Sequence, residues 1–88
     1  MKQYIYNTDM IKKNFIASYA DAIIKGNKLF LVNILTDRQI LIEGEHNMLK
    51  QLVSKLENGV SDEELIYILS KLRIQNLLEV LFREGMIE

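Results

Sequence analysis

The chain has 88 residues, of which 49% are hydrophobic and 26% charged, and its formal net charge is −1 at neutral pH. This length suits one small domain with its own core, and the composition is that of a globular protein and not of a disordered tail. The sequence contains no cysteine, which excludes a disulfide framework, a thiolate metal site and a cysteine nucleophile. A charge this close to zero argues against a general attraction to nucleic acid.

No stretch reaches the roughly 18 consecutive apolar residues of a membrane-spanning helix, and the first residues show no signal-peptide pattern. We therefore expect neither membrane spanning nor secretion. Small secreted domains usually depend on disulfides, so we expect a cytoplasmic protein.

Residues 1–19 form an apolar segment that can be interpreted in two ways. Thr8 or Asp9 could cap a helix, or Tyr4–Tyr6 could be a short edge strand. The helix would carry Met10, Ile11 and Phe15. In either case we expect this segment to cover part of the core or the sheet of a domain formed by residues 20–88.

Three short strands are predicted next, at 22–24, 29–32 and 39–43. Gly26-Asn27 can supply the first hairpin turn, and Thr36-Asp37-Arg38 the second. In the stretch 29–35 both alternating sets of side chains are apolar, Phe30, Val32 and Ile34 on one face and Leu29, Leu31 and Leu35 on the other. Both faces of this antiparallel meander are therefore expected to need cover.

Three amphipathic helices should follow. The first has an apolar face from Met48 to Leu56 and ends at Asn58-Gly59. Ser61 to Glu64 forms a capping box for the second, with Glu64 reaching back to Ser61. The third carries a core stripe and is closed by Gly85. This stripe consists of Ile74, Leu77, Leu78, Leu81 and Phe82.

The expected fold is thus α+β and winged helix-turn-helix-like, with a three-stranded antiparallel sheet followed by three helices. We expect no wing after the third helix, unlike the usual order in winged regulators.

Residues suited to catalysis are few. His46 lies beside Glu45 with no second histidine and no cysteine, so a solvated side chain at a helix start is the simpler interpretation. The acidic run Asp62 to Glu64 is explained by capping and the helix dipole, without a bound cation. We predict no catalytic residue, no metal and no cofactor.

Two surfaces suggest binding. On the third helix, one flank is expected to carry Arg73, Asn76, Val80 and Arg83. Arg and Asn can read base edges in DNA, but acidic neighbours and the apolar centre of this flank suit a peptide better, and an ordinary solvated helix surface explains it equally well. The third strand, Gln39-Ile40-Leu41-Ile42-Glu43, has no proline and could accept an extended peptide at an open edge. The N-terminal segment or a second copy of the chain could pair there instead.

The stretches 22–44 and 48–65, together with the ending Leu77 to Ile87, resemble the PqqD-like domains called RiPP recognition elements. The shared features are a sheet that leads into a helix, an Asn-Gly turn, a Ser cap with acidic residues, and a leucine-rich ending before Gly-Met-Ile. The resemblance covers about residues 20 to 88.

This resemblance implies a non-catalytic domain that captures the leader of a ribosomally made precursor peptide. The leader would add to the third strand and contact the third helix, and a modifying enzyme of cyclodehydratase, adenylating or radical type would act on it. The matching positions are Gln39, Ile40, Leu41, Ile42 and Glu43 on the strand and Arg73, Asn76, Leu77, Val80 and Arg83 on the helix. The alternatives are a DNA-binding regulator and a plain dimerisation domain.

Overall fold

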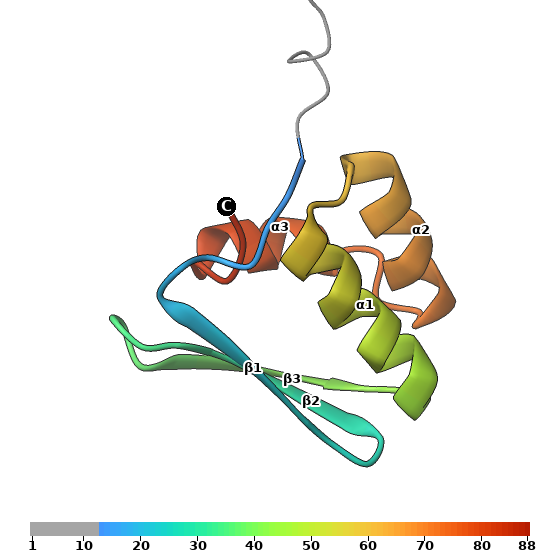
Figure 1. Cartoon of the computed structure of the whole chain (residues 1–88), viewed down its shortest axis with the longest axis horizontal. Coiled ribbons are helices and arrows are strands. Elements are labelled where there is room, and N and C mark those ends of the chain that lie inside the picture. The colour runs from blue at the N-terminus through green and yellow to red at the C-terminus, as the bar shows by residue number, and fades with distance from the viewer. Residues whose placement is uncertain (1–12) are drawn as a thin grey trace, which may run out of the picture.

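The computed structural model describes residues 13–88. The expectations for Tyr4–Tyr6 and for a cap at Thr8 or Asp9 lie outside these residues. In chain order the elements are β1 (Ala20–Lys25), β2 (Lys28–Asn33), β3 (Arg38–Glu43), α1 (His46–Asn58), α2 (Asp62–Lys71) and α3 (Leu77–Arg83). This is the predicted α+β order, a three-stranded antiparallel sheet followed by three helices (Figure 1).

The sheet has the strand order β1-β2-β3 and packs one face against the helices (Figure 1). Successive side chains of a strand point to opposite faces, and burial follows this alternation. On β2, Leu29, Leu31 and Asn33 are buried against the helices, whereas Phe30 and Val32 are only half-buried on the other face. The described residues therefore cover one face of the sheet, where the sequence had predicted cover for both.

The core lies between this face and the three helices. The apolar positions predicted for α1 and α2 form its centre, because their spacing puts them on one side of each helix. The fully buried members include Leu49, Leu52, Leu56, Leu65, Leu69 and Leu81. None of the described helices is long and apolar enough to cross a membrane.

The segment before β1 lies with the helices. Asn14 exchanges backbone hydrogen bonds with Val60, and Phe15 does so with Glu88. Ala17 is buried, while Phe15 remains 42% exposed. The predicted helix therefore does not extend to Phe15, because the backbone here pairs with distant segments instead of with itself.

The second strand ends earlier than its hydrophobic pattern suggests. Asn33 is buried, and its Oδ1 accepts hydrogen bonds from the backbone N–H groups of Leu35 and Thr36. These bonds bend the chain into a turn. Ile34 and Leu35, which were expected to belong to two covered apolar faces, are instead 61% and 74% exposed.

The predicted cap of α2 is half correct. Ser61 is the N-cap, and its Oγ accepts a hydrogen bond from the Glu64 N–H at 3.2 Å. The Glu64 carboxylate pairs with Lys55 Nζ at 2.7 Å instead of reaching back to Ser61. The side chain thus connects α2 to α1.

The third helix is shorter than predicted, because Arg73 has φ +62° and lies outside it. The Arg73 N–H donates to Ser70 O and the Ile74 N–H to Leu69 O, which is the pattern of a Schellman motif that ends α2. The same pattern ends α3, where Gly85 and Met86 donate to Phe82 O and Leu81 O. Phe82, expected in the core stripe, is 37% exposed.

Candidate functional site

The hydrogen-bond ladder shows which groups of β3 face outward. The Gly44 N–H donates to Asn27 O at 2.9 Å, at the end of the β2–β3 register. Pairs in an antiparallel ladder alternate between bonded and non-bonded, so Ile42 and Ile40 direct their backbone groups toward β2. Gln39, Leu41 and Glu43 consequently present their N–H and C=O groups at the free edge.

Within residues 13–88, β2 is the only strand that pairs with β3. The part of the N-terminal segment that the structure describes forms its bridges with Val60 and Ile87, and not with this edge. A regular strand with unpaired backbone groups is a template for a further strand.

A hollow of about 290 Å³ lies at the start of α3. It is lined by Arg73, Ile74, Gln75, Asn76, Leu77 and Val80. Leu77 and Val80 come from the first turns of the helix, and the others come from the turn that precedes it. The hollow therefore combines an apolar wall with polar and cationic groups, which is the usual make-up of a site for one side chain of a ligand.

Arg73 reaches this hollow through an unfavourable backbone conformation. Its left-handed φ of +62° costs an L-residue with a Cβ roughly 1 kcal/mol, and glycine is the usual residue at this position of a Schellman motif. Among residues 13–88, only Asp37 shares such a φ without being glycine. Strained positions of this kind concentrate at functional sites.

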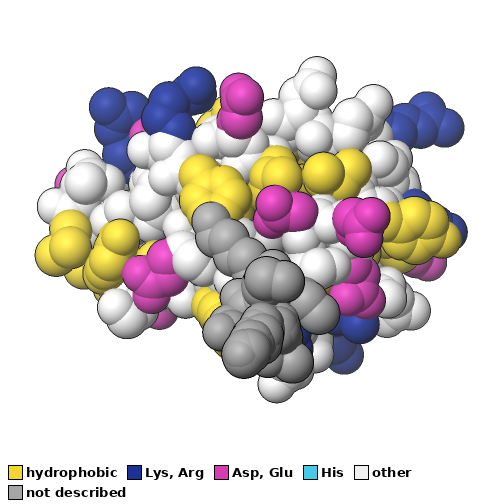
Figure 2. Space-filling model, turned by 90° about the horizontal axis from the view of Figure 1, so that it is seen from above, with side chains coloured by type: hydrophobic (Ala, Val, Ile, Leu, Met, Phe, Trp, Pro, Cys, Tyr) yellow, Lys and Arg dark blue, Asp and Glu magenta, His cyan; other side chains and the backbone are white. Residues whose placement is uncertain are grey.

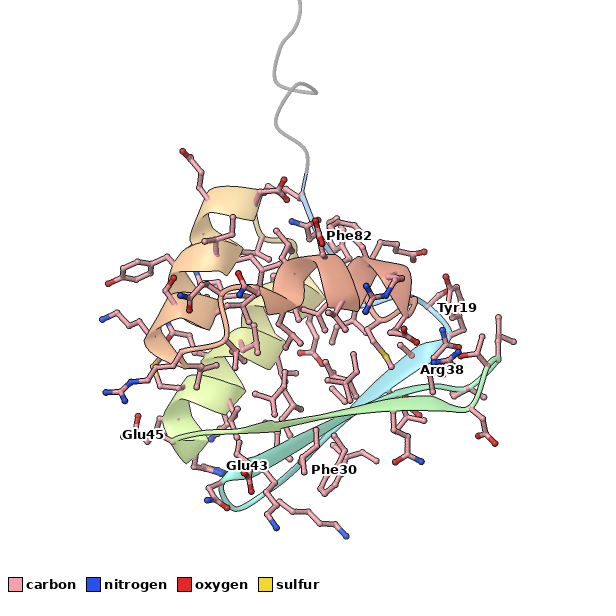
Figure 3. All side chains as sticks on the ribbon, turned by 180° about the vertical axis from the view of Figure 1, so that it is seen from behind. Tyr19, Phe30, Arg38, Glu43, Glu45 and Phe82 are labelled. Atoms are coloured by element: carbon pink, nitrogen blue, oxygen red, sulfur yellow. The ribbon has the colours of Figure 1, made fainter. Side chains whose placement is uncertain are left out.

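Contacts at the two ends of β3 reach residues that lie before and after the segment lining the hollow. At the start of β3, Arg38 Nη1 lies 3.2 Å from Glu84 Oε1, just after α3. At its end, a Cβ on Gly44 would overlap the side chain of Leu72. Seen from behind, α3 lies above β3, and Arg38 and Glu43 mark the two ends of the strand (Figure 3).

The structure brings together some of the predicted site residues and separates others. Arg73, Asn76, Leu77 and Val80 line the one hollow, although the predicted helical flank is wrong, since Arg73 and Asn76 precede α3. Arg83 does not line it, and its Nε contacts Glu84 Oε2 at 3.5 Å.

On the strand, no residue of β3 lines the hollow. Ile42 is buried in the core and Ile40 is half-buried against it, so both side chains point toward the helices and Ile42 is closed to a ligand. Gln39, Leu41 and Glu43 are exposed, and their side chains point to the uncovered face of the sheet. The contribution of β3 is its backbone edge.

Comparison with protein-family models, with curated proteins and with solved structures finds no match for this chain.

Two residues of the hollow were not predicted as part of it. Ile74 was assigned to the core stripe, and Gln75 was not singled out. Both assignments depend on where α3 begins. That start follows from the left-handed conformation of Arg73, at a position where a glycine would have been recognised in the sequence and an arginine was not.

His46 makes a contact within the fold. The ring Nδ1 of His46 lies 2.6 Å from Gly26 O, and because a carbonyl only accepts, Nδ1 carries the proton and ties the β1–β2 turn to the start of α1. In the described part of the chain, no group of three or more His, Cys, Asp or Glu side chains could hold a metal ion.

Proposed function

We propose that this protein binds an extended peptide as a fourth strand on β3, without catalysing a reaction itself. The peptide is the leader of a ribosomally made precursor, and binding presents that precursor to a modifying enzyme in the cytosol. The observation that carries the proposal is the open edge of β3, and the hollow at the start of α3 supports it.

The edge supplies affinity that does not depend on peptide sequence. Three residues of β3, Gln39, Leu41 and Glu43, offer outward N–H and C=O groups, so a peptide in register gains a ladder of main-chain hydrogen bonds. Pairing leaves the fold as it is, because these groups bond to nothing else in the sheet.

The hollow supplies sequence selection. Alternate side chains of an added strand point to the helical side of the sheet, as Ile40 and Ile42 do. One of them can enter the hollow against Leu77 and Val80, with Arg73 and Asn76 near its polar end. The strain at Arg73 supports this role, because a residue that only ended a helix would be better as glycine.

The assignment of the peptide as a leader rests on the resemblance of residues 20 to 88 to PqqD-like RiPP recognition elements. Sheet-first order and an open third strand beside the third helix agree with that resemblance.

The charge distribution favours a peptide over DNA. Arg38 and Arg83 both contact Glu84, so two of the cations near α3 already have an acidic partner. On the helical side, acidic and basic side chains are mixed with hydrophobic ones (Figure 2). A DNA-binding domain would lose affinity steeply as salt rises, whereas strand addition would depend on salt much less.

The test is a calorimetric titration of a synthetic leader from a neighbouring precursor gene. Val80→Asp places a charge in the apolar wall of the hollow, and we expect it to weaken binding at least tenfold. Ile66→Asp, the same kind of change at an exposed position of α2, is the matched control and should bind as the wild type does. Equal affinity of the Val80→Asp variant and the wild type would contradict the proposal.

A further inference from the structure

The face of the sheet that points away from the helices is apolar at its centre. The strand registers place Ile23, Phe30 and Leu41 side by side across the three strands, and we call this line the apolar row. Ile23 and Leu41 are 46% and 51% exposed, and Phe30 lies on the side of the sheet opposite the helices (Figure 3). No described residue covers this row. An exposed apolar line of this kind on a sheet indicates a contact surface.

Two rows flank the apolar row at equal distances. Toward the β1–β2 turn lies the basic row, Lys25, Lys28 and Glu43, and on the other side lies the acidic row, Asp21, Val32 and Gln39. Each of these two rows lies two residues along the strands from the apolar row, a distance of about 7 Å. The face is therefore cationic at one end of β1, anionic at the other and apolar between them.

This pattern is complementary to itself. If a second copy is turned by 180° about an axis that runs along the apolar row, each strand lies over the same strand of the partner, in opposite direction. Lys25 of each copy then lies opposite Asp21 of the other, so the pair forms twice, and the apolar rows meet at the centre. Lys28 comes to lie over Val32, and Glu43 over Gln39, so no like charges face each other.

A second two-fold axis that also lays strands directly over strands runs along β2. It would set Lys25 opposite Glu43, but it would also bring Lys28 against Lys28 of the second copy. Like charges that face each other directly oppose association. The charge pattern therefore favours the axis along the apolar row.

We propose that two copies of this chain associate face to face through the apolar row, with reciprocal Lys25–Asp21 pairs. The three strands cover roughly 14 by 20 Å, or about 300 Å² of each copy, well below the roughly 800 Å² per partner of a stable complex. The dimer is accordingly weak and forms at concentrations on the order of hundreds of micromolar. It uses side chains on the face of the sheet and leaves the edge of β3 open, so it does not depend on the proposed peptide binding.

Sedimentation equilibrium of the full chain at low salt, up to about 1 mM, tests this proposal without any peptide. We expect a reversible monomer–dimer equilibrium. Asp21→Lys and Lys25→Glu should each weaken association about tenfold or more, since each variant turns two attractive pairs into two repulsive ones. The double variant Asp21→Lys/Lys25→Glu should regain most of the lost affinity.

The double variant Lys25→Glu/Glu43→Lys is the matched control. If the two-fold axis runs along the apolar row, this double variant should associate as weakly as Lys25→Glu alone. If this control regains dimer affinity and the Asp21→Lys/Lys25→Glu variant does not, the proposed arrangement is wrong. A wild-type protein that stays monomeric up to about 1 mM would also overturn the proposal. All four substituted proteins should keep the wild-type circular dichroism spectrum, because the three positions are exposed.

Discussion

Asn33 is the residue that joins the sheet to the last helix. Its Nδ2 donates to the carbonyls of Glu84 and Gly85, and its Oδ1 accepts from two N–H groups of the β2–β3 turn. A buried amide with all of these partners fixes the start of β3 relative to the end of α3. The geometry of the candidate site therefore depends on a polar residue within an apolar run, which periodicity alone could not reveal.

We expect Asn33→Ala to lower the free energy of unfolding by about 2–3 kcal/mol, since it removes four part-buried hydrogen bonds and leaves a space in the core where the amide was. Urea denaturation followed by circular dichroism measures this loss. Asn47→Ala, at an exposed position of α1, should change stability by less than about 0.5 kcal/mol. A loss of similar size in both variants would show that Asn33 does not hold these elements together.

Gly85 and Gly26 allow a matched comparison of left-handed glycines. Their φ angles are +72° and +59°, but a Cβ at Gly85 would lie 2.6 Å from Asn33 Nδ2, whereas nothing lies within 4 Å of one at Gly26. Gly26→Ala should cost only the conformational strain, about 1 kcal/mol. Gly85→Ala should cost clearly more, because it also displaces Asn33. Thermal or urea unfolding of both variants gives the comparison, and equal losses would contradict it.

At the scale of the elements, the order of strands and helices was predictable, and several of their ends were not. Alternation in 39–43 and helical spacing in 48–56 are strong signals, because each buries one face of the element. The ends of α1 at Asn58-Gly59 and of α3 at Gly85 carry a glycine, and the sequence predicted both. The turn set by Asn33 and the helix end set by Arg73 lack a glycine. The apolar faces of the second strand were therefore counted as far as Leu35, and the third helix was begun too early.

Substitution of Arg73 by glycine should change the free energy of unfolding in the opposite direction to Gly85→Ala. Because it occupies the left-handed position that ends α2, Arg73→Gly should raise the free energy of unfolding by about 0.5–1 kcal/mol. Ser70→Gly, inside the exposed face of α2, should lower it by roughly 0.5 kcal/mol. If the peptide uses Arg73, the stabilised variant will also bind it less tightly. A destabilised Arg73→Gly variant would show that the strain is not there.

For the molecule as a whole, the sequence predicted the fold class and four of the six residues that line the hollow, but not how the hollow forms. Arg73, Asn76, Leu77 and Val80 were chosen as one face of a helix and lie together because a turn precedes α3. All five residues 39–43 were predicted to pair with a peptide through their backbone, yet Ile40 and Ile42 turn their backbone groups to β2 and their side chains toward the core. Which of these residues have outward backbone groups depends on the register with β2, and that register comes from tertiary structure.

Amide protection in the presence of a leader peptide tests most directly whether a peptide adds to the open edge of β3. In two-dimensional NMR hydrogen exchange, Gln39, Leu41 and Glu43 should exchange quickly in the free protein and slowly once the peptide has added. Ile40 and Ile42, whose N–H groups already bond to β2, should change far less. Binding that protects none of the three outward amides would contradict the addition of the peptide to β3.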